Sequence, residues 1–510
     1  MANPSLQIGN GKWAIKEDSL LGYTELGNNI APVEIDMTRA SAGTRVNPQG
    51  LVETVELLGS EDVVNGDFAT DSSWIKGTGW TIAGGNATLA VQASISSLAS
   101  NTMSVTVGKV YKITINVSAT ASGFRLYDSL GVVSYGLPLG ESVFYRTPSS
   151  SIYTVTPLGL AGSSGVIDNI SVKEYAVNNL ARVNYTGSTS SLLAEPMRTN
   201  LITYSSDFSN AAWLSGGQGK PTIASNNYIS PDGTINADKL TTATSSINYQ
   251  LRQNIAVINT SMTISVYLKA ELADVYVKLY LNDTEHETTV TVTSEWQRFE
   301  LSGLIGGSLL GSGRCGFSTQ SDLSGSNFMY MWGAQLEEGS YSTSLIPTSG
   351  STVTRVQDTF TKTGISDKIN SEEGVLFLEA SALEELSSGN RHISISNGST
   401  SNRLYFYYTQ SGRFGFASFV GGVLQGFINY NGVILNNSKI ACKWKLNDYS
   451  LWVNGVEVGT DTSASVWSAD TLNQFAFADP NAGSSFYGKV KQLQVFKTAL
   501  TDSELATLTT

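Results

Sequence analysis

Apolar and polar residues alternate one by one along many short stretches of the chain. In 111–119 the apolar residues occupy the odd positions, and in 263–270 they occupy the even positions. In 275–282 valine and leucine alternate with Tyr276 and Tyr280, which we expect on the outer face of a sheet. A period of two residues is typical of strands with one buried face, and long helical periodicity is almost absent. The pattern therefore predicts an all-β fold of tandem antiparallel β-sandwiches.

Two segments share an order of aromatic residues and strands that indicates a repeated module. The first contains Phe68 followed by Trp74, and the second contains Phe208 followed by Trp213. Each tryptophan is expected in the core or at a corner of its module, because tryptophan is largely buried in most proteins. Each segment has the length of one jelly roll, so we predict two jelly rolls.

The last part of the chain predicts a third sandwich. Asn454-Gly455 lies between two alternating runs and is typical of a two-residue hairpin turn, and Thr501 with Glu504 forms the pattern of a capping box at the start of a short helix. The expected organisation is an N-terminal region over 1–58, a first jelly roll over 59–177, a junction over 178–204, a second jelly roll over 205–348 and the third sandwich over 352–510.

The charge and hydropathy of the chain exclude two classes of protein. The net charge is −12, from 31 basic and 43 acidic residues, whereas nucleic-acid binding requires clustered lysine and arginine. No run approaches the roughly 18 apolar residues of a membrane span, and the first residues lack the apolar core of a signal peptide. We therefore expect no nucleic-acid binding, no membrane insertion and no export by a leader.

The residues that carry most enzyme chemistry are scarce. The chain has two cysteines, Cys315 and Cys442, and two histidines, His286 and His392, none of them in a recognisable motif. A disulfide between the cysteines is not expected. Adjacent glutamates point to opposite faces of a strand, so the glutamate doublets of this chain are poor acid–base pairs. The prediction is a protein that is not an enzyme.

Two strings of the sequence resemble bacteriophage virion proteins. They are TRASAGTRVN at 38–47, followed by GLVE at 50–53, and SLLAEPMRTNLI at 191–202, which runs into DFSNAAW at 207–213. In that family the two strings normally lie close together, and here a long segment separates them. The resemblance implies that the first jelly roll, over 59–177, is inserted at this junction, so that its two ends lie close in space.

The predicted sandwiches also resemble known families. The jelly rolls are similar to carbohydrate-binding modules, and the third sandwich, with LWVNG at 451–455, resembles a laminin-G or concanavalin-like lectin. Together the resemblances imply a fibre or decoration protein of a phage particle. Such a protein is assembled in the host cytoplasm, is held by other virion proteins through its N-terminal region and displays its sandwiches to bacterial surface polysaccharide. Related fibre proteins are commonly trimers, so a homo-oligomer, with a trimer favoured, is expected; head and tail placement both stay open.

Exposed aromatic rings beside amide or charged groups are the side chains that sugars contact. The glycan-binding candidates are Tyr276 and Tyr280 in the second jelly roll and Arg403, Tyr405 and Tyr407 in the third sandwich. The alternative reading is that these residues cover a neighbouring domain or another copy of the chain.

Asp67 and Asp168 are the candidates for a structural calcium site in the first jelly roll, by resemblance to carbohydrate-binding modules. The alternative reading is that each aspartate caps its own backbone turn. No other cofactor is expected. Two alternative functions stay open at this point: a purely structural capsid or tail component without glycan binding, and a polysaccharide depolymerase. A secreted adhesin is disfavoured by the missing signal peptide.

Overall fold

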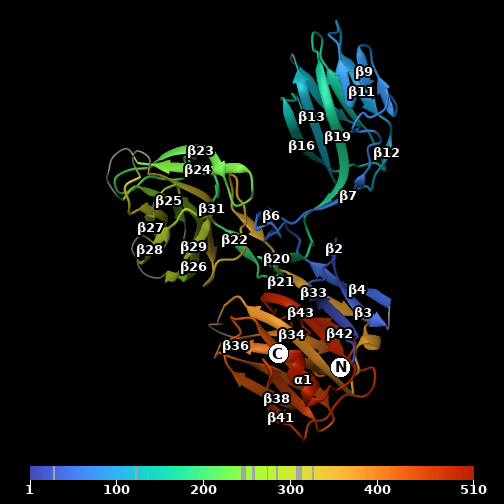
Figure 1. Cartoon of the computed structure of the whole chain (residues 1–510), viewed down its shortest axis with the longest axis vertical. Coiled ribbons are helices and arrows are strands. Elements are labelled where there is room, and N and C mark those ends of the chain that lie inside the picture. The colour runs from blue at the N-terminus through green and yellow to red at the C-terminus, as the bar shows by residue number, and fades with distance from the viewer. Residues whose placement is uncertain are drawn as a thin grey trace. The chain divides into compact units, whose positions relative to one another are not determined.

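The structure is a computed structural model (Figure 1). It describes residues 1–510 apart from 27–28, 121–122, 135, 243–247, 256–258, 273, 283–284, 306–312, 324–326, 385, 387–388 and 411, and it describes only the backbone of 24–31. All pairings between its strands are antiparallel, and the strands stack into sandwiches. The predicted fold class, tandem antiparallel β-sandwiches, is confirmed.

The chain divides into two compact units, one of Glu56–Val177 and one of Met1–Val55 with Asn178–Thr510. The smaller unit is the first jelly roll. Alternate residues of one of its long central strands, from Tyr111 to Val117, are buried in the core as the alternation predicts. One sheet contains β16 (Gly140–Arg146), β13 (Val110–Thr120), β19 (Gly165–Ala176), β10 (Asn86–Leu89), β9 (Trp80–Ala83) and β7 (Leu57–Glu61). The other contains β15 (Gly131–Ser134), β14 (Phe124–Asp128), β18 (Val155–Gly159), β11 (Ser96–Ser100) and β8 (Trp74–Lys76), and β12 (Met103–Ser104) pairs with β17 (Ile152–Tyr153).

The two ends of this unit lie side by side. Its first strand, β7, pairs with the end of its last strand, β19, so that Leu57 is opposite Ala176 and Leu58 is opposite Tyr175. Adjacent ends are what an inserted domain requires. The bounds of the unit differ by three residues at the start from the 59–177 expected from the sequence, and the end is the same.

The second jelly roll belongs to the larger unit. The core lies between its two sheets and contains Ile264, Val266, Leu268 and Ala270, as the alternation in 263–270 predicts. One sheet contains β23 (Thr222–Ile229), β24 (Ile235–Thr241), β31 (Met329–Glu338), β26 (Thr260–Ala270) and β29 (Gln297–Ile305). The other contains β25 (Gln250–Ile255), β30 (Gly313–Thr319), β27 (Val275–Leu281) and β28 (His286–Val292).

The two jelly rolls share one local arrangement. The rings of Phe68 and Trp74 lie 5.2 Å apart and those of Phe208 and Trp213 lie 5.0 Å apart, with similar tilts. In both modules the tryptophan Nε1 donates a hydrogen bond of 2.9 Å to a backbone carbonyl nine residues earlier. The aromatic pattern that suggested a repeat therefore marks the same buried corner in both modules.

The third sandwich completes the larger unit, and its core is the largest in the chain. One sheet contains β38 (Val423–Asn431), β37 (Arg413–Val420), β36 (Arg403–Thr409), β35 (Asn390–Ser396), β42 (Gln474–Ala476), β33 (Thr359–Thr363), β4 (Asn29–Thr38), β3 (Ser19–Leu26) and β2 (Ile15–Lys16). The other contains β41 (Val456–Asp461), β40 (Tyr449–Val453), β39 (Ser438–Lys445), β34 (Glu373–Ala382), β43 (Gly488–Phe496), β1 (Leu6–Gly9), β21 (Thr189–Ala194) and β20 (Arg182–Thr186). Two short pairs of strands complete the larger unit: β5 (Thr44–Val46) pairs with β6 (Val52–Thr54), and β22 (Arg198–Asn200) pairs with β32 (Val353–Arg355).

The expected N-terminal region over 1–58 is not separate from the third sandwich. In Figure 1 the blue strands β3 and β4 lie among the orange and red strands, and β1 pairs with β43. Leu6 and Ile8 are fully buried in the core of the third sandwich, and the backbone of β1 covers an edge of β43 that would otherwise expose unpaired backbone groups. The sandwich therefore needs residues well outside 352–510. A role of this region in attachment stays a prediction.

A short 3-10 turn, η1 (Ser366–Lys368), and one helix, α1 (Asp502–Thr509), complete the described structure. Thr501 and Glu504 form the predicted capping box at the start of α1. The helix covers the outer face of β34 and β39, where Val375 and Phe377 are buried. Cys315 and Cys442 lie in the cores of different sandwiches, so the prediction that no disulfide joins them is confirmed.

We predict that the first jelly roll can be excised. Replacing 56–177 by a short flexible linker is expected to leave a larger unit that unfolds in one cooperative thermal transition, because the ends of the excised unit pair with each other. The isolated segment 56–177 is expected to fold by itself, as circular dichroism and thermal unfolding would show. A matched deletion of residues 1–9 is expected to lower the midpoint strongly, because it uncovers the edge of β43. A larger unit that fails to fold after the excision would contradict the prediction.

Candidate functional site

One sheet of the third sandwich carries an aromatic layer on the side away from the core. On β35, β36, β37 and β38 the alternate residues that point inward, such as Phe406 and Phe416, are fully buried in the core. The residues between them point outward. We call this outward set the aromatic face: His392, Arg403, Tyr405, Tyr407, Phe419 and Phe427.

Rings from β36 and β38 stack over β37, the strand that lies between them. Tyr407 and Phe427 are 5.9 Å apart and almost parallel, at an interplanar angle of 6°. In the register Gly415 lies opposite Tyr407 and Ala417 lies opposite Phe427. The small residues of β37 leave room for rings from β36 and β38 to meet above them.

Only part of the aromatic face is open to solvent. Phe427 is 53% exposed, and Val423 and Leu424 on the same strand are 60% and 47% exposed. Tyr407 is only 4% exposed, beneath Phe427, and its hydroxyl donates a hydrogen bond to Asn429. Tyr405 is half-buried. The residues expected on this face do lie on it, but a ligand would contact Phe427, which sequence reasoning did not select, before Tyr407.

Charged groups line one end of the aromatic face. The Arg403 guanidinium forms an ion pair with Asp479 and lies 4.6 Å above the ring centre of Tyr405. Nδ1 of His392 is 3.4 Å from the Asp479 carboxylate. Burial lowers the pKa of His392 to about 4, against the opposing attraction of Asp479, and the Arg403 charge adds to the lowering. His392 is therefore neutral at pH 7, and Arg403 is held in place by a cation–π contact as well as an ion pair.

The two glycan-binding candidates of the second jelly roll, Tyr276 and Tyr280, differ in their exposure to solvent. Tyr276 is 49% exposed on the outer face of β27, as expected. Tyr280 is only 5% exposed, which contradicts its expected place among the exposed rings. In the register it lies opposite Gly316, and a glycine leaves room for a tyrosine ring to lie down on the sheet. The structure therefore leaves Tyr276 as the exposed tyrosine of this pair.

The calcium candidates bind groups of the chain itself. The Asp67 carboxylate accepts a hydrogen bond of 3.3 Å from the Ala69 backbone, and the Asp168 carboxylate accepts one of 2.6 Å from the Ser118 hydroxyl. Among the described residues, no three histidine, cysteine, aspartate or glutamate side chains gather closely enough to hold a metal ion. A calcium ion at Asp67 and Asp168 stays a prediction.

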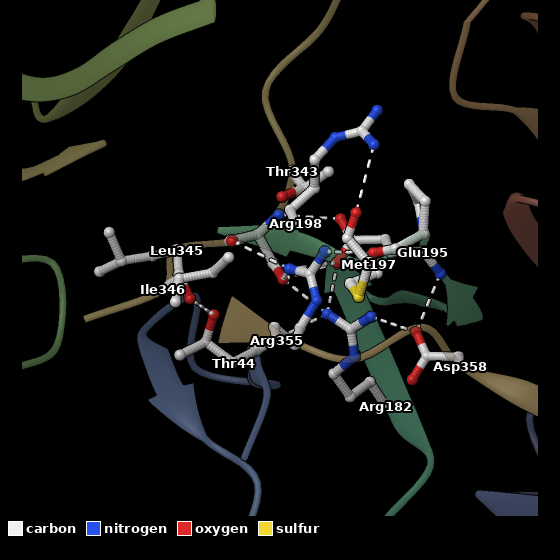
Figure 2. Close-up of polar contacts among 12 residues, drawn as sticks. Thr44, Arg182, Glu195, Met197, Arg198, Thr343, Leu345, Ile346, Arg355 and Asp358 are labelled. Carbon is white, nitrogen blue, oxygen red and sulfur yellow. Dashed lines mark hydrogen bonds and ion pairs between the residues drawn. The ribbon is translucent and has the colours of Figure 1, made fainter. Parts of the chain in front are cut away.

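A buried cluster of charges lies where the two strings that resemble virion proteins meet. We call it the junction cluster: Arg39, Arg182, Glu195, Arg355 and Asp358, each at most 3% exposed. Figure 2 shows Arg182 between Glu195 and Asp358, with Arg355 beside it. Arg182 is 2.5 Å from Glu195, Arg355 is 3.0 Å from Glu195, and Arg39 is 2.7 Å from Asp358.

The junction cluster ties together segments that are distant in the sequence. Ser344, just after the second jelly roll's last strand, donates from both its backbone and its hydroxyl to Glu195. Burial alone would raise the pKa of Glu195, but Arg355 and Arg182 outweigh burial and hold that pKa well below its usual range. The cluster has no exposed surface for a ligand. The two strings that resemble virion proteins each contribute a residue to this cluster, Arg39 and Glu195, so they form a structural joint.

Comparison with known proteins assigns the third sandwich. Residues 383–506 match the laminin-G model of the concanavalin A-like lectin/glucanases superfamily, so the predicted laminin-G or concanavalin-like fold of this part is confirmed. The chain as a whole is a multi-sandwich protein with one lectin-like domain. A search of curated proteins finds no match.

Solved structures overlap with parts of the chain. A CBM40 domain of Ruminococcus gnavus IT-sialidase bound to α2,3-sialyllactose is 19% identical over 27% of this chain and 83% of that one, with a TM-score of 0.24. A CBM22-1–CBM22-2 tandem domain of Paenibacillus barcinonensis Xyn10C is 10% identical over 56% of this chain and 98% of that one, with a TM-score of 0.21. A SAP-like pentraxin of Limulus polyphemus is 14% identical over 28% and 71%, with a TM-score of 0.22.

No helix in the described part of the chain is long and apolar enough to cross a membrane.

Substituting Asp358→Asn is expected to lower the free energy of unfolding of the larger unit by about 3–5 kcal/mol, because it leaves Arg39 buried without its partner charge and removes one of the two carboxylates paired with Arg182. Urea unfolding measures the change. Lys16→Gln is the matched control, since it breaks the exposed ion pair of Lys16 with Glu34 and is expected to have no measurable effect. Equal midpoints for the two variants would contradict a structural role of the cluster.

The buried His392 predicts a pH dependence of stability. The folded pKa is about 4 and the ordinary value is 6.5, so between these values only the unfolded chain binds the proton. The free energy of unfolding should therefore fall as the pH is lowered from 6.5 to 4. His392→Gln removes this contribution, so the wild type should lose up to about 1.4 kcal/mol per pH unit more than the variant. Denaturant unfolding across this range tests it, and equal slopes would contradict it.

Proposed function

We propose that this protein is an appendage of a bacteriophage particle that adheres to bacterial surface glycans through the aromatic face of its third sandwich and has no enzymatic activity. The observation that carries the proposal is the exposed Phe427 ring, supported from below by Tyr407 and flanked by amide groups.

The chemistry of the aromatic face suits a sugar. The apolar C–H side of a sugar ring stacks on an aromatic ring, and its hydroxyls bond to amide and charged groups. Asn429 and Gln425 are partly exposed on the same strand as Phe427, within the same sheet surface. The stack beneath Phe427 fixes its ring, so little side-chain entropy is lost on binding.

The charges of the aromatic face favour binding over hydrolysis. Glycoside hydrolysis typically uses two carboxylates on either side of the scissile bond. The carboxylate beside this face is Asp479, and it is already paired with Arg403. Among the described residues of β35–β38, none supplies a second carboxylate on the outer side. A glycan held here would be bound without being cut.

The assignment to a phage particle rests on the strings at 38–53 and 191–202. Their charged residues Arg39 and Glu195 both enter the junction cluster. Several weak sites on one particle would combine through their effective concentration, which suits adhesion by shallow sugar contacts.

A second candidate function, a contact between copies of the chain, comes from the exposed apolar residues of β38. Val423, Leu424 and Phe427 are exposed on β38, which pairs only with β37 among the described strands. The same residues would suit a contact between copies of the chain, in line with the predicted homo-oligomer. In that case the protein would be a purely structural component of the particle.

Replacing Phe427 by alanine separates the two candidates. The wild type is expected to bind at least one member of an array of bacterial surface glycans, and Phe427→Ala is expected to weaken that binding by about 2- to 10-fold, the worth of one aromatic stacking contact. Val456→Ala, at an exposed position on β41, is the matched control and should bind like the wild type.

The mass in solution, measured by light scattering, completes the test. Glycan binding that is equal in wild type and Phe427→Ala, or absent in both, would overturn the adhesion proposal. A Phe427→Ala protein of lower oligomeric state than the wild type, with no glycan bound by either, would favour the structural candidate.

A further inference from the structure

A polar hollow lies on the other sheet of the third sandwich, at the edge of β43. Its volume is about 270 Å³, and it is lined by residues 10–11, Ser188 and the first two residues of β21, Glu379 of β34, and Lys491 and Gln492 of β43. It lies on a different sheet from the aromatic face. Its walls come from four stretches of the sequence, and of these only Lys491 and Gln492 lie within the lectin-like match at 383–506.

The hollow exists because two strands share one edge of β43. Residues 492–495 of β43 pair with β1, and residues 488–490 pair with β21. Lys491 lies between these pairings: the residue after β1, Asn10, still bonds to its carbonyl, whereas β21 has no residue paired with it. The gap between the two strands is the opening of the hollow.

A β-bulge directs two neighbouring side chains into the hollow. In the register with β34, Glu379 lies opposite Gln492 and Ala380 lies opposite Val490, so Lys491 is an extra residue. Val490 and Leu493 point into the core, and the bulge therefore places both Lys491 and Gln492 on the outer side. Bulges of this kind redirect side chains and are frequent beside functional sites.

A buried carboxylate lies at the floor of the hollow. Glu379 is 8% exposed, and it accepts hydrogen bonds of 2.8 Å from both Gln492 and Asn437, while the Lys491 ammonium lies 3.2 Å away. Burial would raise the pKa of Glu379, but these three groups outweigh burial and lower it. The floor therefore presents a paired carboxylate and ammonium, whose charges cancel.

The walls of the hollow are held in place before any ligand arrives. Gly9 has a φ of +80°, and a Cβ there would lie 2.3 Å from the Lys491 carbonyl oxygen and 2.8 Å from the Trp13 ring, so only glycine lets this loop approach β43. Asn10 donates a backbone hydrogen bond of 2.9 Å to the Lys491 carbonyl. The Trp13 indole donates one of 2.8 Å to the Ser190 hydroxyl and so joins the loop to β21. Fixed walls reduce the entropy lost on binding.

We propose that this hollow is a second saccharide subsite, which binds a single neutral sugar unit. Its lining offers hydroxyl, amide, ammonium and carboxylate groups, which together donate to and accept from sugar hydroxyls. A charged ligand is disfavoured because the charges of Glu379 and Lys491 already neutralise each other. The volume lies just below the roughly 300–1,000 Å³ of pockets for drug-sized ligands, which limits the ligand to about one ring.

The subsite is tested by saturation-transfer NMR on the full-length protein. The probes are D-glucose, D-galactose, D-mannose, L-rhamnose and N-acetyl-D-glucosamine at millimolar concentrations, with N-acetylneuraminic acid as the anionic comparison. Ser188→Trp fills the hollow from an exposed turn position, and Ser468→Trp adds the same ring at an exposed position elsewhere in the third sandwich. Lys491→Met keeps the aliphatic stem and removes the ammonium donors.

At least one neutral sugar should receive saturation from the wild type, from Phe427→Ala and from Ser468→Trp, and that same sugar should receive none from Ser188→Trp. Lys491→Met should weaken binding about tenfold, the effect of losing one charge-assisted hydrogen bond. Transfer to no neutral sugar, or transfer that survives both Ser188→Trp and Lys491→Met, would overturn the subsite. Transfer lost in Phe427→Ala but kept in Ser188→Trp would assign the sugar to the aromatic face, which overturns the subsite and leaves the proposed function in place.

Discussion

The pairing of charges in the junction cluster is the constraint on which the larger unit depends. Three arginines and two carboxylates lie together almost without contact with water, and each must keep its partner because an unpaired buried charge is far more costly than a paired one. The cluster takes its members from the end of β4, from β20, from the end of β21, from β32 and from the residue before β33. A shift of any one of these segments would break several ion pairs at once. The cluster therefore fixes how the chain leaves and enters the third sandwich.

The same region explains how a large insertion is tolerated. The chain leaves the larger unit after Val55 and returns at Asn178, and β7 and β19 pair at the base of the first jelly roll. The Asn179 backbone N–H then donates to the Arg39 carbonyl, and the Arg39 backbone N–H donates to the side-chain oxygen of Asn179, which ties the returning chain to a member of the junction cluster. The bonds that hold the joint together therefore lie within the larger unit, and they do not depend on the residues of the inserted segment.

The sequence predicted the parts of the fold that depend on local pattern. Alternation placed Ile264 and its neighbours in the core of the second jelly roll, and it placed Tyr405 and Tyr407 on the outer side of β36. It did not predict which outward residues stay accessible. Tyr407 lies beneath Phe427 and Tyr280 lies beside Gly316, and both outcomes depend on residues of neighbouring strands. The polar hollow could not be predicted for the same reason. It requires the bulge at Lys491 and the pairing of residues some 480–490 positions apart, and short-range sequence patterns indicate neither.

The pairing of β1 with β43 also sets an order of folding. The Ser5 hydroxyl bonds to the Val495 carbonyl, 490 positions away. The first strand, β1, pairs with β3 at Gln7 and Tyr23, but it lacks its longer pairing with β43 until nearly the whole chain has left the ribosome. At usual translation rates of about 5–20 residues per second, that interval lasts roughly 25–100 seconds. Contacts of such long range form slowly, whereas the first jelly roll is built from contacts within its own segment. The inserted module can thus complete its fold during synthesis while Leu6 and Ile8 still lack their partner strand β43, and the N-terminal strand is exposed to misassembly or chaperone capture in that interval.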